Sequence, residues 1–470
     1  MKQEEKVKIG LEIHGYLQTR EKLFCRCPTT YKDSKPNTNI CPICTAMPGS
    51  KPMLPNEEAI KKIIAIALML KCRINKETIW QRKHYDWPDL PKGYQDTASG
   101  AYSVPIGVEG EFLGIKITEC HIEEDPARWD PATGNVDYNR CGMPLVEIVT
   151  EPDFKDAKQV SNWLKQLLIV LSYIKAVDKD AGIKADVNVS TFGERVEVKN
   201  VNSIYNIERV IEHEILRQRE LMKLGKEILR ETRAFSEKNK VTIAMRTKEQ
   251  TEDYRYIPDP DLPVIDIDEE LVDDIKSNLP ESHLEKIKRF VREYNLTEYD
   301  SKVLSSNLEL AEFFEKVIEK KDLKNPSAKH NKIAKLAASW VTIELLRVLN
   351  YNKKELDEVD ITPEHFTSLL EMIQDNKITE LSAKQILNRF IPKSFNPSKD
   401  LKKIKIIDDK DELTDVCTSV IKKNKKAAED YKSGNEKAIF FLIGQVMKET
   451  QRRADSQRAK EVLEKLLKSI

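Results

Sequence analysis

The residue pattern changes character near residue 269, and this change constrains the fold more than any other feature of the chain. Before it, β-branched segments alternate with turn residues, at 7–17, 112–124, 144–154, 183–192 and 194–203. Helical periodicity in this part is limited to about 56–72, 156–175 and 204–225. The pattern predicts an α+β fold with a mainly antiparallel sheet, because regular βαβ units would alternate strands and helices throughout.

After residue 269, helical periodicity with Lys- and Glu-rich faces continues to about residue 392. Thr362 followed by Pro363 and Glu364 is typical of a helix start. A loop at 390–400 then separates a last segment of about 70 residues. Because 470 residues exceed what one hydrophobic core usually supports, we expect several domains. We expect an α+β domain at 1–290, here called the cradle, an all-α helical domain at 291–400 and a small helical tail domain at 401–470.

Charge is balanced over the chain, with 78 Lys and Arg against 78 Asp and Glu. This argues against a protein that coats nucleic acid but leaves room for basic patches. The segment 401–470 holds 17 basic and 12 acidic residues, a net charge of +5. The longest apolar run, 63–70, is far short of a membrane span, and residues 1–10 contain no apolar signal segment. We therefore expect a cytoplasmic protein without a membrane partner.

Four of the eight cysteines fall within 20 residues, as the pairs Cys25–Cys27 and Cys41–Cys44. Two close pairs of this kind suit tetrahedral zinc, and in a cytosolic protein a metal site is more common than a disulfide framework. The alternative is four unrelated buried thiols. Four sulfur ligands leave no open coordination position, so we expect a structural Zn²⁺ site inserted in the cradle near 25–44.

Acidic residues gather on apolar, strand-like segments. Glu12 and His14 are two residues apart and so lie on the same face of a strand. Further acids follow His121 and occur in the segment 144–154: Glu123, Glu124, Asp125, Glu147 and Glu151. Strand carboxylates with a histidine can bind Mg²⁺, which prefers oxygen ligands and keeps waters for substrate phosphates. A solvated acidic rim is the competing interpretation.

The stretch 80–95 places cations among aromatic rings and prolines, with Arg82, Lys83 and Lys92 as its basic residues. Such a segment can hold a triphosphate or a tRNA end, although a plain surface loop has the same composition. No glycine-rich phosphate-binding motif occurs in the sequence. A nucleotide site would therefore rest on metal and cations.

Taken together, the chain resembles the GatB family, which forms one component of the heterotrimeric aspartyl/glutamyl-tRNA amidotransferase GatCAB. The matching segments are IGLEIHGYLQT (9–19), the two cysteine pairs, RKHYDWPDLPKGYQ (82–95), HIEEDPAR (121–128), YNRCGMPLVEIVTEPD (138–153), ADVNVS (185–190), EVKNVNS (197–203), DYRYIPDPDLP (253–263) and KAIFFLIGQVMKET (437–450). The resemblance spans nearly the whole chain.

The resemblance implies a tRNA-dependent ligase of protein biosynthesis. ATP activates the side-chain carboxylate of Glu-tRNA(Gln) or Asp-tRNA(Asn), and ammonia from glutamine then displaces the phosphate. The GatB component would perform the activation and amidation, in a heterotrimer with the amidase GatA and the small protein GatC. The cradle would resemble glutamine synthetase, and the tail would be YqeY-like and bind tRNA. The choice between the two tRNAs stays open, and so do the docking surfaces for the two partners and the ammonia channel.

The resemblance also assigns roles to residues. Glu12, His14, Glu124 and Glu147 fall where the family places its Mg²⁺ ligands and catalytic groups, with Glu123 and Glu151 as close candidates. Our own inference from the chemistry of phosphoryl transfer, beside the resemblance, gives Arg82, Lys83, Arg140 and Lys184 as candidate nucleotide-phosphate ligands. Lys184 stands where many bacterial members have arginine, which puts a bidentate phosphate contact there in doubt. Some relatives lack the four cysteines, so zinc here would be structural.

Two other functions fit parts of the sequence. The first is that of the archaeal paralogue GatE, from the two-component Glu-tRNA(Gln) amidotransferase. That family carries an inserted domain after the cradle, whereas here IPDPDLPVIDIDEEL (257–271) runs straight into helices. The second is a non-enzymatic, zinc-stabilised tRNA-binding module whose acids are merely surface groups. ATP-dependent phosphate release with misacylated tRNA would separate an enzyme from such a module.

Overall fold

The computed structural model describes residues 6–32, 34–178, 182–247, 254–319, 328–400, 410–450 and 452–469. The chain divides into two compact units, residues 1–282 and residues 283–470. Each unit is described by itself below. The division falls at the start of helix α5 (His283–Tyr294), whereas the sequence placed the end of the cradle near residue 290. Phe290 of this helix lies in the hydrophobic core of the second unit, which accounts for the earlier boundary.

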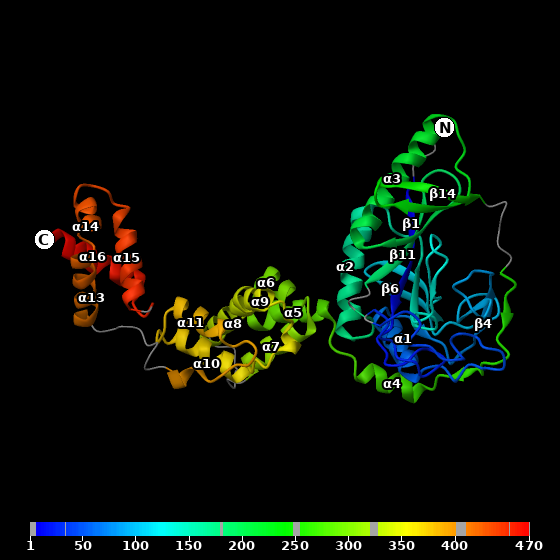
Figure 1. Ribbon diagram of the computed structural model, residues 1–470, viewed down its shortest axis with the longest axis horizontal. Coiled ribbons are helices and arrows are strands. Elements are labelled where there is room, and N and C mark those ends of the chain that lie inside the picture. The colour runs from blue at the N-terminus through cyan, green and yellow to red at the C-terminus, as the bar shows by residue number, and fades with distance from the viewer. Residues whose placement is uncertain are drawn as a thin grey trace. The chain divides into compact units, whose positions relative to one another are not determined.

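A 12-stranded sheet forms the centre of the first unit in the described part of the chain (Figure 1). Its main path runs in the order β14 (Val241–Thr247), β13 (Glu231–Ser236), β12 (Val196–Asn202), β11 (Ile183–Ser190), β1 (Lys8–Tyr16), β10 (Pro144–Thr150), β7 (Ile115–Glu124), β5 (Tyr94–Thr97), β4 (Gln81–His84) and β15 (Ile257–Pro258). Two strands lie off this path, β6 (Gly107–Phe112) beside β7 and β2 (Arg73–Ile74) beside β6. The N-terminal strand β1 thus lies in the interior of the sheet.

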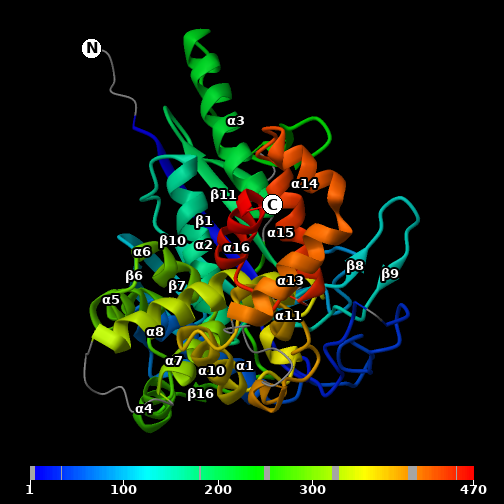
Figure 2. The same ribbon diagram turned by 90° about the vertical axis from the view of Figure 1, so that its left-hand side faces the viewer.

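Nearly all strand pairs are antiparallel, which confirms the predicted α+β class. The pair β12–β13 is parallel, and helix α3 (Ile204–Lys223) makes the crossover that a parallel pair requires. Two short pairs lie outside the large sheet: β16 (Ile265–Asp266) with β3 (Glu77–Thr78), and β8 (Arg128–Trp129) with β9 (Val136–Asp137) (Figure 2).

One face of the sheet is apolar and packs against helices. Ile9, Leu11 and Ile13 of β1 join a core that also contains α1 (Glu57–Met69), α2 (Ala157–Tyr173) and α3 (Figure 1). Helix α4 (Glu269–Ser277) lies against α1. The predicted helical segments therefore form, and three of them begin at side-chain caps, Asn56, Asp156 and Ser203. The other face of the sheet is left for polar side chains.

A bulge in β7 sets which of its residues face the core. Val149 of β10 pairs with Glu119, while the next residue, Thr150, pairs with Ile117. The extra residue in β7 shifts the alternation, so that both Ile117 and Cys120 lie in the hydrophobic core. Alternate positions after the bulge, Glu119, His121 and Glu123, consequently point to the polar face of the sheet.

The second unit is helical in its described residues and has two hydrophobic cores. The first core belongs to α5, α6 (Glu298–Leu304), α7 (Leu308–Glu319), α8 (Ala328–Ser339), a π-helical turn (Trp340–Leu345), α9 (Leu346–Tyr351), α10 (Pro363–Gln374) and α11 (Glu380–Asn388). Short 3₁₀ turns lie at Leu356–Glu358 and Pro397–Asp400. The second core belongs to α13 (Lys410–Lys423), α14 (Lys425–Lys432), α15 (Ala438–Glu449) and α16 (Ser456–Ser469).

The sequence-based helix start at residue 362 is confirmed. Thr362 precedes α10 in an extended conformation, its hydroxyl accepts a hydrogen bond from the His365 N–H, and Pro363 occupies the first turn. None of the described helices has both the length and the apolar character needed to span a lipid bilayer.

Burial of His283 makes the stability of the second unit depend on pH. Its side chain is almost fully buried at the start of α5, and burial lowers the pKa of His283 from 6.5 to about 4. The unfolded chain therefore binds the extra proton first, and stability should fall as the pH drops from about 6.5 to about 4. We expect a loss on the order of 2–3 kcal/mol from this group. Urea titrations of the full chain at several pH values measure it, and a His283→Asn variant should show a shallower decline.

Candidate active site

The polar face of the central sheet collects charged residues from four neighbouring strands. Cross-strand register places His14 of β1 opposite Glu147 of β10 on one side and Lys184 of β11 on the other. Glu147 in turn lies opposite His121 of β7. Directly opposed residues of antiparallel strands point to the same face, so these four side chains share one surface. The buried apolar residues of β1, which alternate with Glu12 and His14, hold this surface against the helices beneath.

The centre of this face is the Glu147 carboxylate, which bridges two histidines. Its Oε2 atom lies 3.3 Å from Nε2 of His14 and 3.3 Å from Nε2 of His121. His121 Nδ1 lies 3.2 Å from the Glu119 carboxylate. Ligand atoms of His14, Glu123 and Glu147 approach to within 4.8 Å of one another, a group that could hold a metal ion. Two carboxylates and an imidazole are suitable ligands for a divalent cation.

Charge coupling in this group is strong because the side chains are largely removed from water. Burial alone would lower the pKa of His14, but its hydrogen bond to Glu147 raises the pKa to about 9. Likewise, the Glu147 charge overcomes burial and raises the pKa of His121 to about 10. Burial and the neighbouring Glu147 raise the pKa of Glu123. Although burial opposes it, the two histidines hold the pKa of Glu147 well below its usual range. Glu147 is therefore held as a carboxylate by His14 and His121, and a bound cation would compete with these two histidines for its charge.

A second acidic group lies on β1, β11 and β12. Ligand atoms of Glu12, Asp186 and Glu197 also lie within 4.8 Å of one another. Lys199 neutralises part of this group, with Nζ 2.9 Å from Asp186 and 3.0 Å from Glu197. The Asn188 amide donates to Glu12 at 3.1 Å. Burial, followed by the charges of Glu147, Asp186 and Glu197, raises the pKa of Glu12. The pKa of Glu12 is thus raised by carboxylates of both acidic groups.

Two lysines share this face. Lys184 lies opposite His14, and burial lowers the pKa of its amine. Lys83 on β4 has its Nζ 4.9 Å from the ring centroid of Tyr254, and its pKa is raised by nearby carboxylates, Glu123 first, which outweigh burial. Arg140 differs, because its Nε lies 2.7 Å from Asp125 and its guanidinium also donates to the carbonyls of residues 126 and 127. Lys83 and Lys184 are therefore better placed than Arg140 to meet an incoming anion.

Strand alternation sends the neighbours of these residues to the opposite side of the sheet. Arg82 is bound by Asp259 at 2.7 Å and Asp261 at 2.8 Å, and its guanidinium lies 4.2 Å from the ring centroid of Tyr94. Glu124 forms an ion pair with Lys92 and accepts a hydrogen bond from the Asp96 N–H at 3.1 Å.

Lys92 also lies 2.5 Å from the Asp96 carboxylate, so one buried cation serves two buried acids. Burial would lower the pKa of Lys92, but the charges of Glu124 and Asp96 raise it far above its usual value. Burial raises the pKa of Asp96 well above its usual value, and the two acidic side chains of the Lys92–Asp96–Glu124 triad share a single cation.

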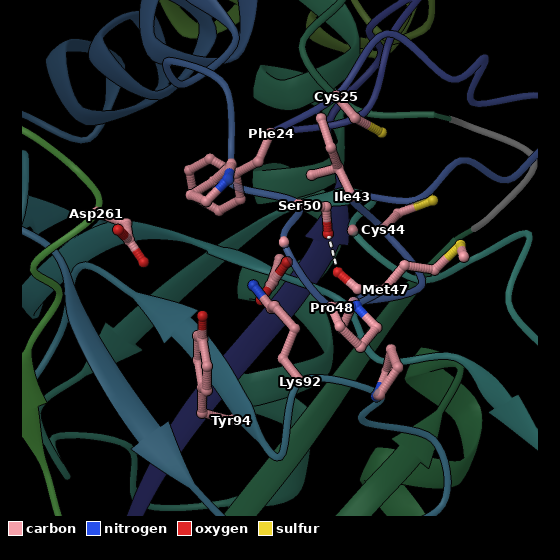
Figure 3. A pocket seen from close by; sticks show the side chains of 16 residues that line it. Phe24, Cys25, Ile43, Cys44, Met47, Pro48, Ser50, Lys92, Tyr94 and Asp261 are labelled. Atoms are coloured by element: carbon pink, nitrogen blue, oxygen red, sulfur yellow. Dashed lines mark hydrogen bonds and ion pairs between the residues drawn. The ribbon is translucent and has the colours of Figure 1, made fainter.

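A cavity of about 280 Å³ opens beside this triad (Figure 3). Lys92, Tyr94 and Glu124 line the cavity, and so do Cys25, Cys44 and residues 46–50 of the cysteine-containing segment. The cavity is therefore formed between the strand that ends in Glu124 and the cysteine-containing segment.

The two cysteine pairs come together beside this cavity. The four sulfur atoms lie within 4.8 Å of one another, and Cys25, Cys27 and Cys44 are buried. The Cys41 and Cys44 sulfurs are 3.9 Å apart, and the backbone N–H of Cys41 donates to the Cys44 sulfur at 3.3 Å. A hydrogen bond from Cys25 lowers the pKa of Cys44 to about 5, whereas burial raises the pKa of Cys27 to about 12. Four converging sulfurs of this kind could hold a metal ion.

The structure brings together some of the sequence-predicted residues and separates others. His14, Glu123 and Glu147 meet, Glu12 belongs to the adjacent acidic group, and Glu124 lies with Lys92 on the opposite side of the sheet. Glu151, which follows β10, accepts a hydrogen bond at 3.0 Å from Thr118, the extra residue of the bulge.

Sequence reasoning did not assign four residues of these groups: His121, Asp186, Glu197 and Lys199. The period-2 alternation of a strand was a usable signal for Asp186, which lies two residues from Lys184, and for His121, which lies two residues from Glu123.

Comparisons with known proteins cover almost the whole chain. Residues 7–273 match the family model described as the GatB/GatE catalytic domain, and residues 312–467 match the GatB domain. The GatB component of the aspartyl/glutamyl-tRNA(Asn/Gln) amidotransferase of Methanococcus maripaludis strain C5 is 46% identical over 99% of both chains. The proteins of the same description from Methanocaldococcus jannaschii and Methanopyrus kandleri are 44% and 45% identical over 98% of this chain, covering 98% and 99% of their own lengths.

Proposed function

The chain belongs to the GatB family of the aspartyl/glutamyl-tRNA(Asn/Gln) amidotransferases, and from this membership we propose that it activates and amidates the side-chain carboxylate of an amino acid carried by tRNA. The substrates are Glu-tRNA(Gln), Asp-tRNA(Asn) or both, and the products are the corresponding Gln-tRNA and Asn-tRNA. The reaction is that of a glutamine-hydrolysing carbon–nitrogen ligase. The observation that carries the proposal is the match over both parts of the chain.

The same match supports a GatB function over the two alternatives. The relatives named above are described as the GatB component and align with nearly the full length of this chain, including the tail. A GatE paralogue has an additional domain, and a binding module would have no use for buried, mutually coupled carboxylates and histidines.

We assign the activation step to the polar face around Glu147. His14, Glu123 and Glu147 would hold Mg²⁺, with Glu12 close by, and their mutual approach supports this. Bound Mg²⁺ would neutralise the negative charge of ATP phosphates and of the developing phosphoryl group. Lys83 and Lys184 would bind phosphate oxygens. Arg82 and Arg140 are already paired with Asp259 and Asp125, and their main role would be to hold these acids in place.

Amidation would require the complex of this chain with two partner proteins. The amidase GatA would release ammonia from glutamine, and the small protein GatC would stabilise the assembly. The basic tail at 401–470 would contact the tRNA body, an interaction that weakens as salt increases. Because aminoacyl-tRNA is consumed by ribosomes in the cytoplasm, we place the protein in that compartment.

We assign a structural Zn²⁺ to the four cysteines, and we expect the full chain to purify with about one zinc per chain. Cys41→Ser should lose most of this zinc, because a three-sulfur site lacks the fourth strong ligand. The matched control is Cys72→Ser, a buried cysteine outside the cluster, which should keep it. Metal analysis of purified protein measures the difference. Equal zinc in the two variants would contradict the assignment.

The proposed function is tested in the complex reconstituted with the amidase and the small partner protein. ATP, Mg²⁺, glutamine and either Glu-tRNA(Gln) or Asp-tRNA(Asn) are supplied, and the amino acid removed from the tRNA is identified. Glutamine or asparagine, with ATP-dependent release of phosphate, is the expected result. Unchanged glutamate and aspartate despite tight tRNA binding would overturn the proposal in favour of a binding module.

A further inference from the structure

Lys22 is a buried cation whose surroundings are unusual. Its side chain is only 1% exposed, and it is among the largest fully buried side chains of the described residues. Its Nζ atom lies 3.6 Å from the Cys44 sulfur and 3.2 Å from the carbonyl oxygen of Tyr138. Among described residues, no carboxylate oxygen lies within 4.0 Å of this nitrogen.

A buried ammonium group without a counter-ion is costly, because burial removes its hydration. Two other lysines of this unit each face two carboxylates. Lys92 faces Glu124 and Asp96, and Lys199 faces Asp186 and Glu197. Lys22 is instead directed at a sulfur atom. Within the described part of the chain, the negative charge that can meet it directly is that of deprotonated cysteines.

We propose that Lys22 is the counter-charge of the four-cysteine metal centre and positions Cys44 as a thiolate ligand. This rests on the proposed zinc occupancy of the cysteines. A divalent ion with four thiolates carries an excess of two negative charges, and the buried Lys22 ammonium offsets one of them. The N–H···S hydrogen bond orients the Cys44 sulfur, as outer groups commonly do for metal ligands. Lys22 is thus a positioning residue of the metal centre.

The same side chain links the metal centre to the cavity that contains Glu124. Lys22 binds the carbonyl of Tyr138, and the Leu23 N–H donates to the carbonyl of Gly142 at 2.9 Å. Gly142 has a φ of +80°, and a β-carbon there would lie 3.7 Å from Cys44 Cβ and 4.0 Å from Glu124 Oε2. Lys22 therefore binds the turn at residues 138–143 through the Tyr138 carbonyl, and Gly142 of this turn lies beside Cys44 and lines the cavity.

The test measures zinc retention in the full chain. Lys22→Met should release zinc to an excess of a chromogenic chelator at least about tenfold faster than the wild type, since outer-group substitutions typically cost about 10–100-fold in metal affinity. Lys32→Met is the matched control, because Lys32 lies in the same segment but pairs with the Asp178 carboxylate, at 3.4 Å. It should release zinc at the wild-type rate.

A second variant separates charge balance from packing. Replacing a thiolate with a neutral imidazole removes one negative charge, so Lys22→Met with Cys44→His should retain zinc better than Lys22→Met alone. If Lys22→Met fails to fold, Lys22→Gln against Lys32→Gln gives the same comparison, because glutamine keeps an N–H donor for Tyr138.

The possible failures are distinguishable. A wild-type chain without zinc overturns the zinc assignment itself. A zinc-loaded wild type from which the Lys22 variants release zinc no faster than the Lys32 controls overturns the role of Lys22 alone. Failure of the charge-balanced double variant to improve on Lys22→Met would reduce Lys22 to a packing residue. The amidation activity of the complex is not needed for any of these readings.

Discussion

Glu147→Gln is expected to lower ATP-dependent phosphate release by the reconstituted complex by about 10³-fold. The substitution keeps the shape of the side chain but removes the anion between His14 and His121. Without that charge, the proposed Mg²⁺ site would lose one of its two carboxylates, and metal neutralisation of transferred phosphate contributes several kcal/mol. The tRNA affinity should stay within about twofold, because the charge lies on the sheet face rather than on the basic tail.

The matched control for this prediction is Glu151→Gln. Glu151 follows directly after the strand that carries Glu147, yet its carboxylate accepts a hydrogen bond from Thr118 outside the group around Glu147. Its variant should keep activity within a few-fold of wild type. Phosphate release and tRNA binding are measured on both variants, with thermal unfolding as a check on folding. Equal losses of activity and tRNA binding in Glu147→Gln would mean that the residue is structural.

Lys92→Met is expected to lower the free energy of unfolding of the first unit by about 3–5 kcal/mol, because it leaves Asp96 and Glu124 buried without their cation. The loss should be smaller near pH 5 than near pH 8. Burial raises the pKa of Asp96 well above its usual value, and a protonated acid costs less to bury than a carboxylate. Urea unfolding followed through the transition of the first unit measures the effect.

Two controls define the origin of the loss. Lys51→Met removes an exposed lysine paired with Asp261 and should change stability by less than about 1 kcal/mol. Adding Glu124→Gln to Lys92→Met should recover part of the loss, since one of the two orphaned charges is then removed. A double variant no more stable than Lys92→Met would show that packing around the Lys92 stem, rather than its charge, is the main contribution.

Much of the secondary structure could be predicted from the sequence because the period-2 segments are long and bounded by turn residues. The strands around residues 8–16, 144–150 and 183–190 and the helices near 57–69, 157–173 and 204–223 form close to the expected positions. The order of strands in the sheet could not be predicted, because pairing over 100 residues or more leaves no local signal. The bulge at Thr118 was also invisible, since an extra residue in one strand is defined only by its partner.

The candidate site was partly predictable for the same reason. Glu12 and His14 do share a face, as their spacing required. The resemblance groups Glu123 and Glu124 together as candidate Mg²⁺ ligands, whereas adjacent strand residues point to opposite sides of the sheet. Glu123 faces Glu147, and Glu124 faces Lys92. Arg82 and Lys83 separate in the same way. The partners that occupy each side came from remote strands, and only the tertiary structure reveals them.

Strand β7 contributes Cys120 and Ile122 to the hydrophobic core and His121 and Glu123 to the charged face, so its length should not tolerate change. A residue inserted or deleted between the bulge and Glu124 would exchange the two faces, sending apolar side chains into the charged group and carboxylates into the helix-covered core. Substitution at a single position disturbs one contact, whereas a length change disturbs every contact beyond it. Diversification of chains built on this plan should therefore proceed in β7 by exchange of residues, with gains and losses of residues confined to turns such as the β8–β9 hairpin.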